Sequence, residues 1–201
     1  FIGLMNYKSI LFFLGIYSFL VSFFCILNIL YSVYFFSSGL NSYLVTLLIS
    51  LVIGSLFCFI GRGYQKNISL INQIIFIILG FILMSLLITP PYFLSNYNIT
   101  LLNSYFESVS GLTTTGFSII EDINEIDPPL LLWGSSSQWL GGLFFFIATV
   151  GTLGSKQIKI KPAYLISGGA SGRNFYNNFN YNFIKISLIY FTSTIFVIFL
   201  Y

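Results

Sequence analysis

The sequence YFESVSGLTTTGFS, at residues 105–118, decides how this chain folds. Its first half continues an apolar-periodic stretch that begins at Ile99, with large apolar side chains at helical spacing up to residue 112. A helix over 99–112 is too short to cross a bilayer, which takes about 20 residues, but it can enter a membrane and return. A threonine and glycine cluster at 113–117 follows it directly. The stretch therefore predicts a re-entrant half-helix and an extended return segment.

The sequence carries signals for both ends of this half-helix. Asn98 or Thr100 is a suitable N-cap, and Gly111 is expected to stop the helix. Apolar runs long enough to span a bilayer flank the segment, at Ile68–Leu94 and Ser135–Gly154. The order of span, half-helix, extended segment and span is the layout of a pore-loop unit.

Composition places the whole chain in a lipid environment. Of its 201 residues, 57% are hydrophobic and 6% are charged, whereas a soluble domain carries roughly 25% charged residues. Further apolar runs lie at Ser9–Phe36, Leu40–Ile60 and Tyr181–Tyr201, and each is close to or above the length of a span. The predicted fold class is an all-α polytopic membrane protein, with the lipid bilayer as its surroundings.

The absence of histidine excludes several kinds of chemistry. It removes histidine-based acid-base catalysis, the usual zinc sites and Ser-His-Asp triads. The eight Lys and Arg residues form no dense basic face, which argues against nucleic acid as a partner. We therefore expect a protein that is not an enzyme and needs no cofactor. A membrane enzyme is the alternative, and activity-based labelling of Ser or Cys would test it.

The charged residues predict the orientation in the membrane. In a four-pass arrangement all basic residues fall on one side: Lys8, Arg62, Lys66, Lys156, Lys159, Lys161, Arg173 and Lys185. Acidic residues outside the half-helix fall on the other side: Glu121, Asp122, Glu125 and Asp127. The positive-inside rule makes the basic side cytoplasmic. We predict a multi-pass protein of the inner (plasma) membrane with a cytoplasmic amino terminus and an acidic outer mouth.

The segment Thr113-Thr114-Thr115-Gly116-Phe117 has the chemistry of a cation filter. A cation that sheds its water needs oxygen ligands, and consecutive backbone carbonyls of an extended segment supply them. Gly116 lacks a Cβ and can adopt backbone angles that turn its carbonyl toward the ion path. The half-helix before it directs the partial negative charge of its C-terminus toward the pore. A polar turn between helices is the alternative interpretation of this cluster.

Residues 105–118 resemble the first pore loop of the TrkH/KtrB (Trk/Ktr/HKT) superfamily of potassium transporters. LLWGSSSQWLGGL, at 131–143, is similar to the stretch that leads into the second helix of the family's first repeat. The two leading spans resemble the extra amino-terminal helices of the TrkH-like branch. The resemblance implies four span, pore-loop and span repeats around one pore, all in a single polypeptide.

Carried onto matching positions, the resemblance gives each filter residue an expected place. Gly116 matches the family's filter glycine, and the carbonyls of Thr114 and Thr115 are expected to hold K⁺, with Thr113 and Phe117 beside them. The family also implies a cytosolic nucleotide-binding regulatory subunit and a homodimer of the full-length protein. The predicted function is potassium uptake through a carbonyl-lined filter, as part of a Trk-type system. A non-conducting structural or assembly subunit is the alternative.

The resemblance divides the chain into three parts. Residues 1–66 would hold two leading spans, 67–160 the first pore-loop repeat, and 161–201 a cytoplasmic loop with the start of a second repeat. One filter segment cannot surround an ion. We therefore expect the chain to be the amino-terminal part of a longer transporter, and assembly of several copies is the alternative.

Further residues near the filter are predicted to support it: Glu107, Gly111, Gln138 and Trp139. Glu107 lies at membrane depth, where an ionisable group is expected to have a function. We expect a structural anion that accepts hydrogen bonds from backbone N–H groups, and a proton-coupling carboxylate is the alternative. For Gln138 and Trp139, helix packing is favoured over ion contact, and the paired glycines at 141–142 allow close approach of helices.

Overall fold

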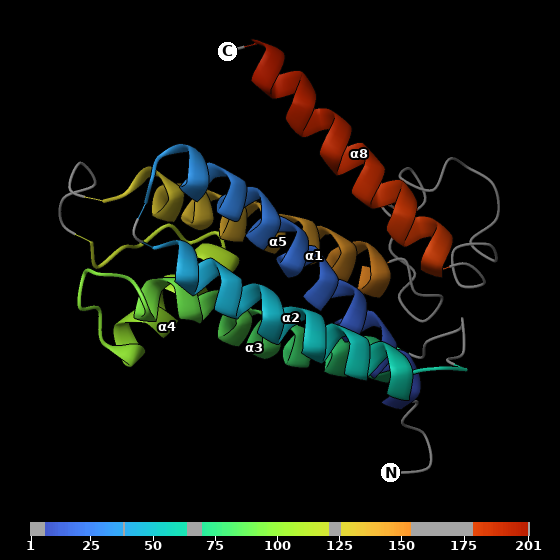
Figure 1. Cartoon of the computed structure of the whole chain (residues 1–201). Coiled ribbons are helices and arrows are strands. Elements are labelled where there is room, and N and C mark those ends of the chain that lie inside the picture. The colour runs from blue at the N-terminus through green and yellow to red at the C-terminus, as the bar shows by residue number, and fades with distance from the viewer. Residues whose placement is uncertain (1–6, 38, 64–69, 121–125, 154–178, 201) are drawn as a thin grey trace.

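The chain folds into a bundle of helices, described by a computed structural model for residues 7–37, 39–63, 70–120, 126–153 and 179–200 (Figure 1). The described elements are all α-helices: α1 (Tyr7–Tyr34), α2 (Leu40–Ile60), α3 (Leu70–Phe93), α4 (Leu101–Leu112), α5 (Pro128–Leu153) and α8 (Phe179–Leu200). Among them α1, α2, α3 and α5 are long and apolar enough to cross a membrane. The predicted all-α polytopic membrane protein is therefore confirmed.

The apolar runs predicted most helix bounds closely, and α5 is the exception. Its predicted start was Ser135, but the helix begins at Pro128. Proline is favoured in the first turn of a helix, because its missing N–H would have no intrahelical partner there. Asp127 precedes this start, and its backbone carbonyl accepts from the N–H of Leu130 at 2.9 Å. The polar residues of 134–138 consequently lie inside α5 rather than before it.

Small residues hold α1 and α2 together in the most extensive interface of the bundle. A Cβ added at Gly15 would lie 2.9 Å from the carbonyl oxygen of Gly54, so the two backbones nearly touch. The hydroxyls of Ser22 and Ser50 lie 2.7 Å apart across the same interface. Close approach of small residues with a hydrogen bond between helices is a common way to pack helices in lipid.

An aromatic cluster joins α1, α3 and α5 at the centre of the bundle. The ring of Phe144 meets Tyr17 edge-on at 4.8 Å and Phe81 at 4.9 Å between centroids. Gly80 leaves the room that this ring occupies, because a Cβ there would lie 2.3 Å from Phe144. Edge-to-face pairs of this kind add to the stability given by burial alone. The cluster fixes α3 and α5, which are the two helices that hold α4 between them.

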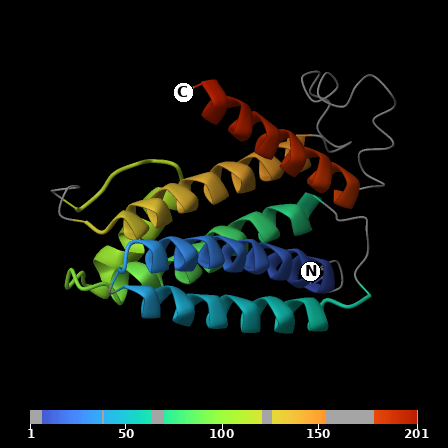
Figure 2. The same cartoon turned by 45° about the horizontal axis from the view of Figure 1, so that its top comes forward.

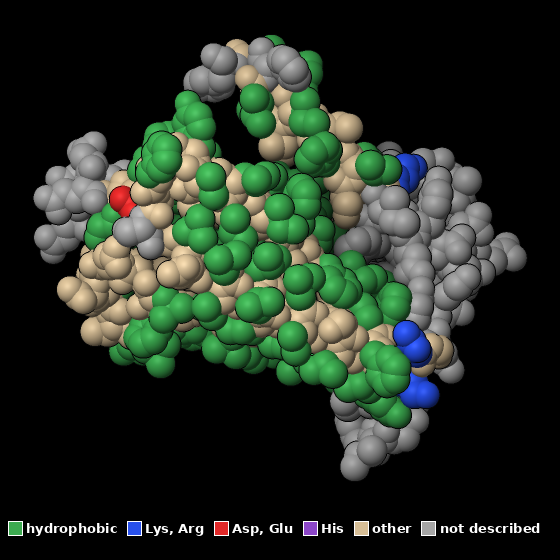
Figure 3. Space-filling model, in the orientation of Figure 1, with side chains coloured by type: hydrophobic (Ala, Val, Ile, Leu, Met, Phe, Trp, Pro, Cys, Tyr) green, Lys and Arg blue, Asp and Glu red, His purple; other side chains and the backbone are tan. Residues whose placement is uncertain are grey.

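The described charges separate to the two ends of the bundle. Figure 3 shows Lys and Arg side chains at one end and an acidic side chain at the other, with a hydrophobic surface between them. Lys8 lies in the first turn of α1, Arg62 follows α2 and Lys185 lies in the first turns of α8. Asp127 lies at the opposite end, beside the start of α5. This separation agrees with the predicted arrangement of charges. Which end is cytoplasmic stays a prediction, and several charged residues lie outside the described ones: Lys66, Glu121, Asp122, Glu125, Lys156, Lys159, Lys161 and Arg173.

Helix α8 packs on α5 and diverges from the rest of the bundle (Figures 1 and 2). A Cβ on Gly142 would lie 2.4 Å from the hydroxyl of Tyr190, so this glycine admits the α8 side chain. The predicted division at 66, 160 and 201 stays a prediction, and all three positions lie outside the described residues.

Candidate ion-filter site

Helix α4 is the predicted half-helix, and it is 12 residues long. Thr100 caps its N-terminus, where the Thr100 hydroxyl accepts from the N–H of Asn103 at 3.3 Å. This confirms one of the two predicted N-caps. The prediction that Gly111 stops the helix is wrong, because the helix continues to Leu112. Gly111 instead permits close packing, since a Cβ there would lie 2.1 Å from the hydroxyl oxygen of Ser137 on α5.

The chain reverses direction at Thr113, Thr114 and Thr115. The N–H of Thr115 donates to the carbonyl of Ser110 at 3.0 Å, and the N–H of Thr114 donates to the carbonyl of Gly111 at 2.9 Å. Thr114 has a φ of 56°, in the left-handed region. These bonds and this angle form a Schellman motif, which satisfies the last carbonyls of a helix. It is this motif, and not Gly111, that ends α4.

Thr114 is an unusual residue for this position. Glycine or asparagine normally occupies the left-handed place of a Schellman motif, and a β-branched residue there is strained. The hydroxyls of its neighbours Thr113 and Thr115 lie 2.7 Å apart, and Thr113 Oγ1 also donates to the carbonyl of Val109 at 2.8 Å. Strained backbone that neighbouring groups hold in place is found often at functional sites. Sequence reasoning missed this conformation, because the residue type argues against it.

The carbonyl oxygens of Thr113, Thr114, Thr115 and Gly116 accept no hydrogen bond from the part of the chain that the structure describes. All four residues are exposed. Gly116 has a φ of 78°, and a Cβ there would meet nothing within 4 Å. The glycine is therefore required by the backbone conformation and not by lack of space. The result is a run of consecutive oxygens that a cation could use in place of water.

Ser110 holds the far end of this segment against α4. Its hydroxyl donates to the carbonyl of Phe117 at 2.5 Å. The predicted filter residue Phe117 thus has a carbonyl that is already engaged, and its ring is 71% exposed. Ser110 itself is buried. Sequence reasoning did not single out Ser110, since a serine on a half-helix has many possible partners.

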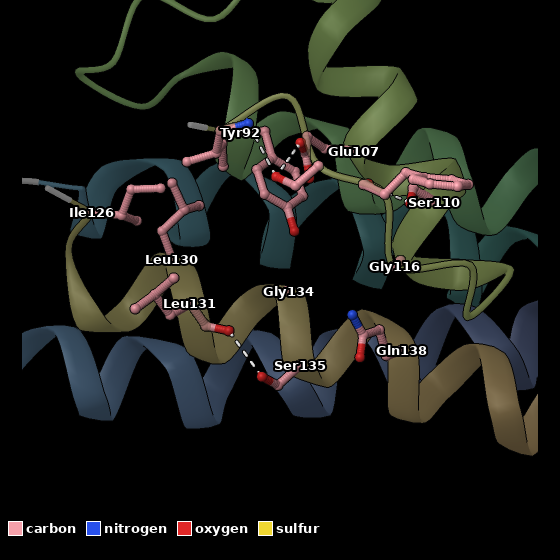
Figure 4. A pocket seen from close by; sticks show the side chains of 14 residues that line it. Tyr92, Glu107, Ser110, Gly116, Ile126, Leu130, Leu131, Gly134, Ser135 and Gln138 are labelled. Carbon is pink, nitrogen blue, oxygen red and sulfur yellow. Dashed lines mark hydrogen bonds between the residues drawn. The ribbon is translucent and has the colours of Figure 1, made fainter. Parts of the chain in front are cut away.

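Glu107 fastens the segment that leaves the filter (Figure 4). Its side chain is 7% exposed. One carboxylate oxygen accepts from the N–H of Ile119 at 2.6 Å and from the hydroxyl of Ser118 at 2.8 Å. Ser118 Oγ in turn accepts from the N–H of Ile120 at 3.1 Å. Glu107 thus accepts from one backbone N–H and one hydroxyl, contacts that fit the predicted structural role, and the choice between that role and proton coupling stays a prediction.

A pocket of about 390 Å³ lies between the filter segment and α5. Figure 4 shows Glu107, Ser110 and Gly116 on one side and Gly134, Ser135 and Gln138 of α5 on the other. Gln138 is exposed and lines this pocket, so the structure brings it near the filter segment.

Gly141 and Trp139 lie on different faces of α5. A Cβ on Gly141 would lie 1.8 Å from the carbonyl oxygen of Leu112, so α5 touches the backbone at the last residue of α4. The indole of Trp139 donates to Thr194 Oγ1 at 3.0 Å and packs on Phe24 at 5.2 Å between centroids. Trp139 therefore contacts α8 and α1, which is the packing role that the sequence analysis favoured over ion contact.

Asp127, which precedes α5, is hydrogen-bonded to the α1–α2 connection and to the α3–α4 connection. Its carboxylate accepts from the hydroxyl of Ser37 at 3.0 Å, and its N–H donates to the hydroxyl of Tyr97 at 2.6 Å. Burial raises the pKa of the Tyr97 phenol above its usual value, so the group stays neutral. Asp127 is the one acidic residue of the predicted outer mouth within the described part of the chain.

Substitution of Glu107 separates its two candidate roles. Glu107→Ala leaves the N–H of Ile119 and the hydroxyl of Ser118 without their acceptor in a part-buried site, which costs about 1–3 kcal/mol. With the segment acting as the predicted cation filter, we expect cation uptake by the full-length protein to fall about tenfold. Glu107→Gln keeps an acceptor oxygen, so most uptake should remain, with an unchanged dependence on external pH. Equal losses in both variants, together with a lost pH dependence, would instead support proton coupling.

Comparison with known proteins identifies relatives of this chain. It is 34% identical to the Trk system potassium uptake protein TrkG of Escherichia coli (strain K12) over 80 residues, 39% of this chain and 16% of TrkG. It is 35% identical to TrkI of Halomonas elongata over 75 residues, 37% of this chain and 15% of TrkI. The chain is homologous to the Trk potassium uptake proteins. The resemblance to the TrkH/KtrB superfamily, predicted from two motifs, is thereby confirmed.

The Trk relatives are longer than the part matched here. TrkH of E. coli (strain K12) is 28% identical over 109 residues, which are 54% of this chain and 23% of TrkH. The matched part thus spans less than a quarter of each of these three relatives. No protein-family model matches the sequence, and no solved structure matches it.

Proposed function

We propose that this chain supplies one filter segment of a potassium uptake pathway in the plasma membrane. The observation that carries the proposal is the run of carbonyl oxygens from Thr113 to Gly116, exposed and without hydrogen-bond donors among the described residues. Backbone carbonyls that accept no hydrogen bond within a membrane protein need a polar ligand, because lipid offers none. A partly dehydrated K⁺ is such a ligand, and the Trk names of the relatives favour it.

The mechanism follows from the geometry of the site. The C-terminus of α4 carries about half a negative charge and lies directly before Thr113. A cation there would exchange water for the carbonyls of Thr114 and Thr115, with those of Thr113 and Gly116 next to them. Ser110 donates to the carbonyl of Phe117, and Glu107 accepts from the N–H of Ile119. These two bonds would keep the filter carbonyls oriented. The ion is passed on without covalent chemistry.

One segment cannot surround an ion, so the proposal requires further segments. These would come from the rest of a full-length protein or from other copies of the chain. From the distribution of charges we propose a cytoplasmic amino terminus. From the resemblance to the TrkH/KtrB superfamily we propose a homodimer of the full-length protein and a cytosolic nucleotide-binding regulatory subunit. The basic end of the bundle, which carries Lys8 and Arg62, would face that subunit.

Ion uptake tests the proposal directly. The full-length protein that contains this chain is produced in cells without their own potassium uptake systems, and growth at low K⁺ and Rb⁺ influx are measured. We expect restored growth and an influx that excess K⁺ suppresses and excess Na⁺ suppresses less. Correctly inserted protein that gives neither would favour a non-conducting subunit.

A further inference from the structure

A groove opens between α1 and α2 at the basic end of the bundle, far from the filter. Its volume is about 490 Å³. Apolar side chains, two small polar ones and a single cation line it: Phe12, Ser55, Leu56, Cys58, Phe59 and Arg62. The groove therefore combines an apolar wall with a positive charge at the membrane surface.

Arg62 provides a charge that is free to bind a ligand. Its guanidinium carbon lies 4.6 Å from the centre of the Phe59 ring, in a cation–π contact. The side chain is exposed and forms no ion pair within the described residues. The aromatic contact orients the guanidinium over the groove and leaves its N–H donors available.

The backbone of a second cationic residue, Lys8, lies beside the end of α2. A Cβ on Gly61 would lie 2.8 Å from the carbonyl oxygen of Lys8, so the start of α1 touches the end of α2 beside Arg62. The acidic residues that the structure describes, Glu107 and Asp127, belong to α4 and to the start of α5. Figure 3 shows the basic side chains together at one end, away from the acidic one.

The apolar wall of the groove continues onto the lipid-facing surface of α2. Leu56 is 53% exposed and Phe59 is 63% exposed, and both lie on a helix that is long and apolar enough to span a bilayer. A molecule bound here would therefore have one part in the hydrocarbon and one part at the charged surface. A phospholipid has this shape, and the bilayer supplies it at high concentration.

We propose that the groove binds an anionic phospholipid, with its phosphate at Arg62 and Lys8 and an acyl chain along Phe12, Leu56 and Phe59. Basic pockets between membrane helices bind anionic headgroups, and each Lys or Arg near the surface contributes about a fivefold gain in affinity. The lipid would join α1 to α2 at this end. This site goes beyond the proposed potassium pathway and does not depend on it.

Lipid binding to the full chain, purified in detergent, tests the site. Native mass spectrometry counts the phosphatidylglycerol and phosphatidylcholine molecules that the protein retains during titration with each lipid. We expect tighter retention of one phosphatidylglycerol, and Arg62→Gln should weaken it about fivefold. Lys185→Gln is the matched control, because it removes an exposed cation of α8 outside the groove and should leave retention unchanged.

A second variant distinguishes loss of the lipid site from misfolding of the protein. Leu56→Trp fills the apolar part of the groove and keeps Arg62, so it should displace the bound phosphatidylglycerol, while phosphatidylcholine retention elsewhere on the protein stays constant. Equal effects of Arg62→Gln and Lys185→Gln would overturn the proposal. So would displacement of the lipid by millimolar inorganic phosphate, which would indicate a site for a free anion.

Discussion

Replacing Gly116 with serine in the full-length protein is expected to reduce strongly the preference for potassium over sodium that the proposed filter would confer. Gly116 has a φ of 78°, and a residue with a Cβ pays about 1–2 kcal/mol to remain in the left-handed region. The backbone can relieve this strain by rotating the peptide groups on either side. Such a rotation would turn the carbonyls of Thr115 and Gly116 away from the ion path. Since 1.36 kcal/mol corresponds to a factor of ten, we expect selectivity to fall about tenfold or more.

The measurement is Rb⁺ influx in competition with K⁺ and with Na⁺, for protein inserted at equal levels. Gly63→Ser is the matched control. Gly63 also has a positive φ, 77°, and a Cβ there also meets nothing within 4 Å, but it lies after α2 at the other end of the bundle. The control therefore carries the same backbone strain far from the filter. Unchanged selectivity in Gly116→Ser, or an equal loss in both variants, would contradict the filter assignment.

The sequence predicted the helices well because lipid imposes simple requirements. An apolar run of about 20 residues has few alternatives to a spanning helix, so the run Leu40–Ile60 matches α2 at both ends. The half-helix was predicted because 99–112 is apolar in part and too short to span. Thr100 was predicted as an N-cap because its hydroxyl accepts from an N–H in the first turn of the same helix, so no distant residue is involved.

Features that depend on tertiary contacts were predicted less well. Gly111 has the residue type of a helix stop, but its role is set by Ser137, which lies on another helix. The early start of α5 at Pro128 could not be predicted from hydrophobicity, because two prolines next to acidic residues do not extend an apolar run.

The site was predicted in its composition and not in its geometry. The threonines and Gly116 were identified, but the left-handed Thr114 was not, since threonine seldom adopts that conformation. The bond from Ser110 to Phe117 joins the half-helix to the segment after the turn, so only the folded turn makes it visible. Glu107 was predicted to accept hydrogen bonds because a carboxylate at membrane depth needs donors. Ser118 and Ile119 on the returning segment supply them.

Replacing Gly141 with alanine is expected to destabilise the pore loop more than the same change at Gly134 or Gly142, the other α5 glycines whose surroundings the structure describes. The added Cβ would lie 1.8 Å from the carbonyl oxygen of Leu112 and 2.5 Å from its carbonyl carbon. Both atoms belong to the backbone of Leu112, so neither can move unless α4 is displaced from α5. Overpacking of this kind costs about 1–3 kcal/mol, and displacement of α4 also moves the filter segment that follows Leu112. We therefore expect the free energy of unfolding and the cation influx to fall together.

Gly134→Ala, on the same helix, is the control for this substitution. A Cβ there would lie 3.3 Å from the hydroxyl of Tyr92, the far end of a side chain that can shift slightly. Both variants gain the same helix propensity, about 1 kcal/mol for glycine to alanine. Gly134→Ala should therefore unfold at the same or higher denaturant concentration, and Gly141→Ala at a lower one. Unfolding of the purified protein, followed by circular dichroism, gives the comparison. If both variants are as stable as the parent protein, α4 does not rest on α5 at Leu112, and the filter must be held mainly by Glu107 and Ser110.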